Sequence, residues 1–501
     1  MTLLLPALQS PTGPAASREA VRFGALSLTY GELAAASAAL ATRIADAGRV
    51  AVWATPTAET VIAVVAALRA GAPAVPLNPR TGEAELAHIL ADSEPTAVLA
   101  GPDDALPPAL EKLRRVTVDA RVAAEAPEGY GPGEAAAEAP ALIVYTSGTT
   151  GPPKGAVLPR RAIAASLDAL EDAWGWTGDD VLVHALPLFH VHGLILGVLG
   201  PLRRGGSLRH LGKFSAEGVA RELGSGGTML FGVPTMYHRL AEVLDASAGG
   251  GERDASAGGG ERDALAGALT RARLLVSGSA ALPVHDHERI AAATGRRVIE
   301  RYGMTETLMN TGIRADGVPR PGTVGPPLAG VELRLVEEDG TVPAGPEAIG
   351  EIQVRGPNLF TGYLNRPDAT AAAHTADGWF RTGDVGTLGE DGYVTIVGRK
   401  ATDLIKSGGY KIGAGEIENV LLGHPGVREA AVTAEADPDL GERVVAWVVA
   451  ADPDSPPRAE ELADHVAGQL APHKRPRTVH FLDALPRNDL GKIMKRSLHV
   501  R

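Results

Sequence analysis

The chain has 501 residues, too many for one compact unit, so at least two domains are expected. Its net charge of −12 argues against a nucleic-acid partner held by bulk electrostatics, and the absence of cysteine excludes disulfides, a thiolate nucleophile and thiolate metal ligands. The first residues lack a basic start and a long apolar core, and the longest apolar runs are far too short for a membrane span, so a cytoplasmic protein that binds no membrane is expected.

The first hundred residues alternate between helical and strand patterns. Thr29, followed three residues later by Glu32 and then by an Ala-rich run, predicts a capped helix start. Residues 49–54 and 73–77 read as buried strands, and residues 61–68 predict a helix between them. This strand–helix–strand order predicts an α/β fold with parallel strands.

A strand pattern at residues 141–145, after a Gly- and Pro-rich surface connection, leads into a loop of alternating hydroxyls and glycines. Glycines let the backbone approach a ligand closely, and hydroxyls with the ammonium of Lys154 suit a polyphosphate. The P-loop of ordinary nucleotide hydrolases needs Ser or Thr directly after the lysine, but Gly155 stands there. For a shorter run, a flexible polar loop would be an equal alternative. The residues expected at the phosphates are Thr146, Ser147, Gly148, Thr149, Thr150, Gly151 and Lys154.

This string resembles the phosphate loop of the adenylate-forming superfamily, which includes acyl-CoA synthetases, luciferases and peptide-synthetase adenylation domains. Further motifs similar to those of the superfamily follow in the expected order over nearly the whole chain. The resemblance implies a large N-terminal domain of α/β layers with a β-subdomain, and a small mobile α+β C-terminal domain. We place the boundary at a hinge residue, Lys400, which gives an ATP- and acyl-binding domain over residues 1–399 and a mobile domain over residues 400–501.

Two histidines stand in an apolar setting at residues 185–194. The pair His190 and His192 suggests a metal site, but no third ligand is apparent in the sequence. A buried or gating His190 is the favoured interpretation. The resemblance implies that this position separates the carboxylate substrate from the incoming thiol.

Residues 232–239 predict a helix with Pro234 in its first turn. The resemblance implies that this segment borders the acyl pocket, and the string is similar to that of malonyl-CoA synthetases. A buried Arg239 would pair with a second, distal carboxylate, with the hydroxyl of Ser277 beside it. The alternative is a surface ion pair of Arg239. The pocket residues that the resemblance implies are Arg239, Ser277, His190, Val191 and Met304.

A nine-residue string occurs twice in succession at residues 246–263. It is Gly-rich and polar, without apolar periodicity, and we interpret it as a replication slip tolerated in an exposed, mobile loop.

The string at residues 302–307 resembles the superfamily's second nucleotide motif. The resemblance implies that the ring of Tyr302 packs on adenine and that Thr305 contacts a phosphate. Glu306, together with Thr149 of the phosphate loop, would hold Mg²⁺, a hard cation that prefers oxygen ligands. On the motif alone, a turn with a solvated glutamate is an even alternative. Further nucleotide contacts implied here are Ser277, Gly278, Gly303 and Met304.

From residue 322 the pattern changes to short β-like pieces, which predict a β-subdomain packed on the α/β core. Asp384 resembles the carboxylate that holds the ribose hydroxyls, a device also used in other nucleotide sites. Arg399 is the matching ribose or phosphate contact. As alternatives, Asp384 would be a turn residue and Arg399 a surface charge.

Beyond Lys400 the sequence predicts a separate small α/β module. The segment Lys406, Ser407, Gly408 and Gly409 resembles the lining of the pantetheine tunnel, although a plain β-hairpin is the alternative. Lys492 matches the superfamily's catalytic lysine, which stabilises charge developing at the α-phosphate. Acetylation would remove that charge, and the resemblance implies control of this kind, so a protein acetyltransferase acting on Lys492 is an expected partner.

These motifs predict an acid–CoA ligase that uses ATP, Mg²⁺ and coenzyme A. Malonate, and also methylmalonate, is the expected acid; it would form acyl-AMP and then acyl-CoA, with Lys492, Glu306, Thr305 and His190 in catalytic roles. Three alternatives stay open: a short- or medium-chain or aryl acyl-CoA ligase, an adenylation enzyme that loads a carrier protein, and a catalytically silent nucleotide-binding regulator. Intact Lys154, Glu306 and Lys492 argue against the last.

Overall fold

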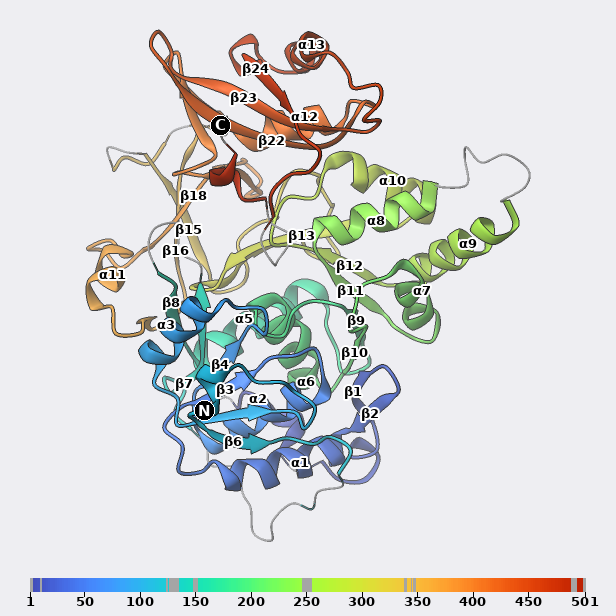
Figure 1. Cartoon of the computed structure of the whole chain (residues 1–501), viewed down its shortest axis with the longest axis vertical. Coiled ribbons are helices and arrows are strands. Elements are labelled where there is room, and N and C mark those ends of the chain that lie inside the picture. Colours follow the sequence, from blue (N-terminus) through green and yellow to red (C-terminus); the bar gives the residue numbers. More distant parts are fainter. Residues whose placement is uncertain are drawn as a thin grey trace.

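The computed structural model describes residues 3–9, 11–122, 125, 135–146, 152–245, 255–337, 340–343, 345, 348–487 and 493–498, with residues 255–259 as backbone only. Within these ranges the strands form four sheets, three in the larger part of the molecule and one in the module at the top of Figure 1.

The first sheet is built around parallel strands from the N-terminal part of the chain. Its spatial order is β17-β8-β7-β4-β3-β5-β6 in the described part of the chain. The pairing is parallel from β7 through β6, while β8 and β17 are antiparallel additions at one edge. The strands are β3 (Val50–Trp53), β4 (Ala74–Leu77), β5 (Ala97–Ala100), β6 (Arg114–Thr117), β7 (Pro140–Thr146), β8 (Lys154–Pro159) and β17 (Gly362–Tyr363).

The predicted strand–helix–strand unit is confirmed. Helix α2 (Ala58–Ala70) connects β3 to the parallel strand β4, and residues 60–68 are all buried. A helix that is apolar on every side must be covered on every side. Here α2 contacts strands of both large sheets, so it lies between them. On its flank, α1 (Tyr30–Arg43) begins at Thr29 with the predicted capping box, in which Thr29 and Glu32 satisfy each other's backbone N–H groups.

The second sheet carries the edge at which the site lies. Its order is β14-β13-β12-β11-β9-β10-β1-β2 among the described residues, and β13, β12, β11, β9 and β10 are mutually parallel along this order. In open α/β sheets, ligands bind beyond the carboxyl ends of such strands. The strands are β1 (Glu19–Phe23), β2 (Leu26–Thr29), β9 (Val181–His184), β10 (Ser207–His210), β11 (Met229–Gly232), β12 (Leu274–Ser277), β13 (Val298–Met304) and β14 (Leu308–Gly312).

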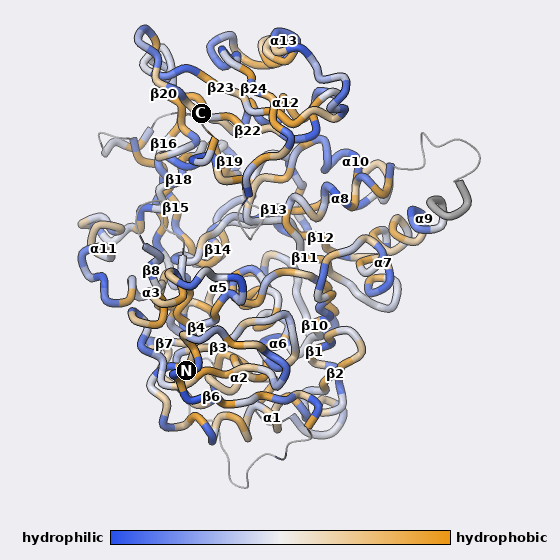
Figure 2. The backbone as a smooth tube through the Cα atoms, viewed as in Figure 1, coloured by the Kyte–Doolittle hydropathy of each residue, from blue (hydrophilic) through white to orange (hydrophobic). Residues whose placement is uncertain are grey.

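Helices cover both large sheets (Figures 1 and 2). One of them, η3 (His192–Leu199), is a fully buried π-helix, a rare form that occurs mostly at functional sites. The others are α3 (Glu83–Ser93), α4 (Pro108–Glu111), α5 (Arg160–Trp174), α6 (Gly200–Arg204), α7 (Ala216–Gly224), α8 (Pro234–Asp245), α9 (Ala255–Arg271) and α10 (Val284–Thr294).

The duplicated string does not form the predicted loop throughout. Its first copy, residues 246–254, lies outside the described residues, but the second copy starts α9. The prediction was wrong for this copy because it considered the string alone. Buried Leu265, Ala268 and Leu269 follow on one helical face, and helix formation propagates backward from them through the glycines.

The third sheet is the predicted β-subdomain, in the order β15-β16-β18-β19. It is antiparallel throughout, and β18 carries Asp384 opposite Arg399 of β19. The elements are β15 (Glu332–Val336), β16 (Gly350–Arg355), α11 (Pro367–Ala372), β18 (Phe380–Leu388) and β19 (Val394–Arg399).

The fourth sheet starts just after Lys400 and has an apolar core of its own, formed by residues from Ile405 to Val466. This separate core supports the proposed domain boundary at Lys400. The elements are β20 (Leu404–Ser407), β21 (Tyr410–Gly413), α12 (Ala414–Leu422), β22 (Val427–Asp437), β23 (Gly441–Ala450), α13 (Ala459–Gln469) and β24 (Thr478–Phe481).

Among the described helices, none combines the length and the apolar character needed to cross a membrane.

Candidate active site

The strands on either side of the predicted phosphate loop are paired. Thr146 at the end of β7 lies opposite Lys154 at the start of β8. His88 of α3 supports the exit of this loop, with its Nε2 2.9 Å from the Pro153 carbonyl oxygen. The predicted contacts Ser147, Gly148, Thr149, Thr150 and Gly151 lie outside the described residues.

Two predicted nucleotide motifs, far apart in sequence, meet at Asp384. The Tyr302 hydroxyl donates to one Asp384 oxygen at 2.6 Å, and Arg399 Nε lies 2.9 Å from the other. Arg399 also donates to the Thr382 carbonyl at 3.0 Å. Burial, reinforced by the Asp384 charge, raises the pKa of Tyr302 well above its usual value, so its hydroxyl stays a donor. The structure thus brings Tyr302, Asp384 and Arg399 together.

A second polar cluster lies beside this one. Glu306 is buried, and its Oε1 accepts a hydrogen bond from the Tyr363 hydroxyl at 2.9 Å. The Tyr363 ring in turn lies under the Lys154 ammonium, 5.0 Å from ring centroid to Nζ. Burial raises the pKa of Glu306, while the hydrogen bond from Tyr363 and the charge of Arg399 oppose that rise. Glu306 and Lys154, expected at Mg²⁺ and phosphate, therefore share one neighbour.

The donor set around Glu306 fits a magnesium ion held partly by substrate. Mg²⁺ in nucleotide sites is bound by one or two carboxylates plus phosphate oxygens and water, not by a full protein cage. In the described part of the chain there is no cluster of three or more His, Cys, Asp or Glu side chains.

The most unusual charge in the site is Arg301, one residue before Tyr302. Its side chain is buried, and Nε and Nη2 have no hydrogen-bond partner among the described residues. Burial lowers its pKa from 12.5 to about 10, so it is still a cation at neutral pH. The guanidinium lies against Gly278, where a Cβ atom would come within 2.4 Å of Arg301 Cζ. Burying a cation without an opposite charge costs much free energy, so we expect an anion to bind beside Arg301.

Ser277, which precedes Gly278, and His192, which is affected by the Arg301 charge, also carry buried polar atoms without partners among the described residues. The Ser277 hydroxyl and both ring nitrogens of His192 are buried without a partner in the described structure. Burial, and after it the Arg301 charge, lower the pKa of His190 to about 4 and that of His192 well below its usual value, so both rings are neutral at pH 7. Ser277 ends β12, Arg301 lies on the adjacent strand β13, and the two histidines follow β9 in the segment that leads into η3, where the Arg301 charge acts on both rings. The predicted pocket residues Val191, which is buried, and Met304, which is partly buried, belong to the same segments.

The burial assumed for Arg239 is wrong. Helix α8 buries Tyr237, Leu240, Ala241 and Leu244 on one face, and Arg239 lies off that face and is exposed. Its guanidinium forms no ion pair with any described residue, so the surface ion pair offered as the alternative is also absent. A role for Arg239 at the substrate stays a prediction.

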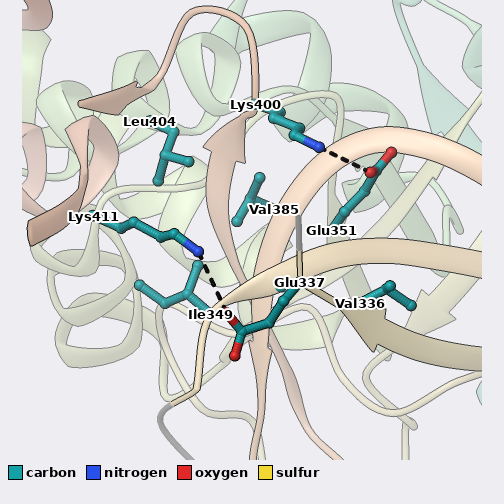
Figure 3. Close-up of a pocket in the computed structure, with 9 residues that line it drawn as sticks. Val336, Glu337, Ile349, Glu351, Val385, Lys400, Leu404 and Lys411 are labelled. Atoms are coloured by element: carbon teal, nitrogen blue, oxygen red, sulfur yellow. Dashed lines mark hydrogen bonds and ion pairs between the residues drawn. The ribbon is translucent and has the colours of Figure 1, made fainter. Parts of the chain in front are cut away.

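The small domain meets the β-subdomain at a shallow hollow near the hinge (Figure 3). Lys400 Nζ lies 3.2 Å from Glu351 of β16, and Lys411 Nζ lies 3.6 Å from Glu337. Lys411 belongs to the β20–β21 hairpin, whose turn is Gly408–Gly409 at φ 57° and 83°, values that favour glycine. The alternative of a β-hairpin is therefore correct as a description of shape. In this hairpin Lys406 is exposed and Ser407 is buried. Lys492 lies outside the described residues.

Arg301 and Tyr363 were missed from the sequence. The sequence contained a signal for Arg301. This charged residue stands directly before the Tyr302 motif, at the end of a run of buried strand residues, where a charged side chain is unusual. For Tyr363 there was none, because its hydroxyl reaches Glu306 across 57 residues of chain.

The Asp384 cluster gives a first prediction. Asp384→Asn keeps the size of the side chain but removes its negative charge. That charge pairs with Arg399 and strengthens the hydrogen bond that the carboxylate accepts from Tyr302. Losing a buried charge-assisted hydrogen bond costs about 1.5–3 kcal/mol, so the KM for ATP should rise roughly 10- to 100-fold. The matched control is Asp377→Asn, which alters an exposed pair with Arg334 outside the site. An unchanged KM for ATP in Asp384→Asn would show that this carboxylate does not serve the nucleotide.

Two family models match the chain. The model described as AMP-binding enzyme covers residues 10–364, and the model described as AMP-binding enzyme C-terminal domain covers residues 416–492. The chain belongs to the AMP-binding enzyme family. The predicted superfamily is thereby confirmed.

Relatives of this AMP-binding enzyme point in one direction. A malonyl-CoA ligase solved as a ternary product complex with methylmalonyl-CoA and AMP is 69% identical, with a TM-score of 0.73, covering 96% of this chain and 100% of that one. ATP-bound MatB from Rhodopseudomonas palustris is 34% identical, with a TM-score of 0.86, covering 99% and 97%. The malonate–CoA ligase of Arabidopsis thaliana is 36% identical, covering 90% of this chain and 77% of its own length. The α/β fold with a large and a small domain is confirmed.

Proposed function

We propose that this AMP-binding enzyme is an AMP-forming malonate–CoA ligase that also accepts methylmalonate. Malonate and ATP give malonyl-AMP and pyrophosphate, and CoA then gives malonyl-CoA and AMP. The proposal is supported by the three relatives above, whose names state malonate, malonyl-CoA or methylmalonyl-CoA, or whose structure holds ATP. The similarity to this chain extends over most of the length of each of the three relatives. We therefore propose the whole reaction and not one of its steps.

The observation that carries the choice of acid is the buried, unpartnered Arg301. One carboxylate of the acid must stay free to attack the α-phosphorus, so a guanidinium in the acyl pocket is useful only for a second carboxylate. An arginine fork suits a carboxylate because it can donate two parallel hydrogen bonds. The Ser277 hydroxyl and a His192 N–H are further donors without partners. A monocarboxylate would leave all of them unsatisfied in the bound state.

No side chain of the protein is a nucleophile in this scheme. The substrate carboxylate attacks first, and the CoA thiol attacks second, so the protein contributes positioning, charge stabilisation and exclusion of water. Lys154 holds triphosphate charge, while Tyr302, Asp384 and Arg399 hold the nucleoside. Mg²⁺ bound by Glu306 and phosphate oxygens would neutralise charge on the leaving pyrophosphate. His190, neutral at pH 7, adds no second cation to compete with Arg301.

A substrate panel tests the assignment. We expect malonate to be preferred over propionate and butyrate by roughly 30- to 1000-fold in kcat/KM, because a buried unsatisfied charged donor costs on the order of 2–4 kcal/mol. Methylmalonate, which adds one methyl group, should stay within about 1 kcal/mol of malonate. AMP release is measured with each acid, and with either CoA or a carrier protein as the acceptor. This assay gives the specificity for the acid and the specificity for the acceptor. A preference for butyrate would support the short-chain alternative, and AMP release that needs a carrier protein would support the loading enzyme.

The predicted cytoplasmic location of the protein stays a prediction.

A further inference from the structure

Tyr363 stands between the two residues that are expected to hold the charged end of ATP. Its hydroxyl donates to Glu306 Oε1 at 2.9 Å, and its ring faces the Lys154 ammonium at 5.0 Å. No predicted motif contains it. We propose that Tyr363 is a positioning residue that fixes the Glu306 carboxylate and the Lys154 ammonium in register for a magnesium–triphosphate. The inference rests on the proposed use of MgATP.

The carboxylate side of this bridge depends on the hydroxyl. Glu306 is buried, and the backbone on which it sits is fixed because its carbonyl accepts from the Phe360 N–H at 2.8 Å. The Glu306 side chain still has rotatable bonds. Among the described side chains, Tyr363 is the one recorded as donating a hydrogen bond to the Glu306 carboxylate. Without that bond the carboxylate has several rotamers to choose from, and only some of them point to the phosphates.

The ammonium side depends on the ring and not on the hydroxyl. Lysine has a long flexible stem, and a cation held over an aromatic face loses much of that freedom. Lys154 and Tyr363 lie on adjacent strands, since Tyr363 of β17 pairs with Ala156 of β8. A phenylalanine at residue 363 would therefore keep the Lys154 contact while removing the Glu306 contact.

Tyr363 itself is held independently of both partners. Its backbone N–H donates to the Thr370 hydroxyl at 2.9 Å, and its ring packs edge-on against Phe360 with centroids 4.9 Å apart. The strand pairing with β8 adds a third restraint. A ring fixed in this way can serve as a reference point for two flexible side chains, and it should stay in place when only its hydroxyl is removed.

The experiment compares Tyr363→Phe with Tyr363→Leu by equilibrium binding of ATP to the full chain, with Mg²⁺ and with EDTA. Tyr363→Phe should bind ATP in EDTA like wild type, within about twofold, and should lose roughly tenfold in affinity when Mg²⁺ is present. Tyr363→Leu should show the same magnesium-dependent loss and a further loss of roughly two- to fivefold in EDTA, because the cation–π contact is gone.

The matched control is Tyr393→Phe. Tyr393 has the same two kinds of contact outside the site, a hydroxyl bonded to the Val318 carbonyl and a ring under Arg320. It should change ATP binding in neither condition. Equal losses with and without Mg²⁺ in Tyr363→Phe would overturn the inference, as would binding unchanged from wild type in both variants. If wild type binds no ATP in either condition, the proposed function itself fails, which is a different result.

Discussion

Replacing Arg301 with methionine is expected to lower kcat/KM for malonate by roughly 30- to 5000-fold while leaving ATP binding near normal. Methionine is similar in length, but it carries no charge and cannot hold a carboxylate. Removing one partner of a buried, hydrogen-bonded charge pair costs about 2–5 kcal/mol. Turnover of propionate or butyrate should change little or increase, because these acids never used the charge. The same kinetic panel on both proteins, with ATP binding measured separately, checks the expectation.

Stability separates this role from a structural one. A structural arginine stabilises the free protein, whereas Arg301 lacks partners for Nε and Nη2 among the described residues. Arg301→Met should therefore stabilise the unliganded protein, by about 1 kcal/mol or more, since it removes an uncompensated buried charge. Malonate should raise the melting temperature of wild type and not of the variant. A less stable variant that still prefers malonate would make Arg301 a structural residue and remove the main argument for malonate.

Arg239→Ala provides the comparison within the same pocket prediction. At its observed exposure, Arg239 should contribute about 1 kcal/mol or less to malonate binding, which is below roughly fivefold. A loss as large as that of Arg301→Met would mean that Arg239 becomes buried when substrate binds. In that case the double variant should lose less than the sum of the two single losses, because both side chains would hold one carboxylate.

The fold was predictable wherever a local pattern decided the outcome. The capping box at Thr29 and Glu32, and the apolar helix between two buried strands, both follow from short windows of sequence. The prediction of a mobile loop for the second copy of the Gly-rich duplication was wrong because residues outside the repeat decided its structure. This copy is helical because of apolar residues that lie beyond it, at Leu265 and Leu269, and these were outside the repeat that was interpreted.

The site was predictable where a motif is contiguous and not where it is assembled. Tyr302, Asp384 and Arg399 were identified one by one, and the structure brings them together through side-chain bonds that no spacing encodes. Arg239 was expected to be buried because the resemblance placed its segment at the acyl pocket, and the apolar face that α8 turns toward its neighbours was not considered. Specificity requires knowing which cation lacks a partner, and that is a property of the three-dimensional packing.

Removing the charge of Lys492 is expected to separate the two half-reactions. If Lys492 stabilises charge at the α-phosphate, Lys492→Ala should slow formation of malonyl-AMP by roughly 10²- to 10³-fold, the usual effect of losing one electrostatic contact to a transition state. Supplied with synthetic malonyl-AMP and CoA, the same variant should form the thioester at close to the wild-type rate. Lys112→Ala, at an exposed lysine outside the site, is the control.

Acetylation provides an independent route to the same test. It removes the lysine charge without changing the chain, so enzyme acetylated at Lys492 should behave like Lys492→Ala in both half-reactions. Mass spectrometry gives the fraction modified. Full adenylation activity with Lys492 completely acetylated would show that its charge is not needed.

The separation should be reciprocal because both functions are carried by one small domain. Gly409→Ala places a side chain in a turn residue at φ 83°, in the hairpin expected to contact pantetheine, so it should slow thioester formation and spare adenylation. Rotation of the domain about Lys400 between the two steps must break the Lys411–Glu337 pair and strain the Lys400–Glu351 pair. Both lysines are partly exposed, so each pair costs about 1 kcal/mol or less to open and does not prevent the motion. If Lys492→Ala slows the thioester step as much as the overall reaction, one orientation of the domain serves both steps and no such rotation is needed.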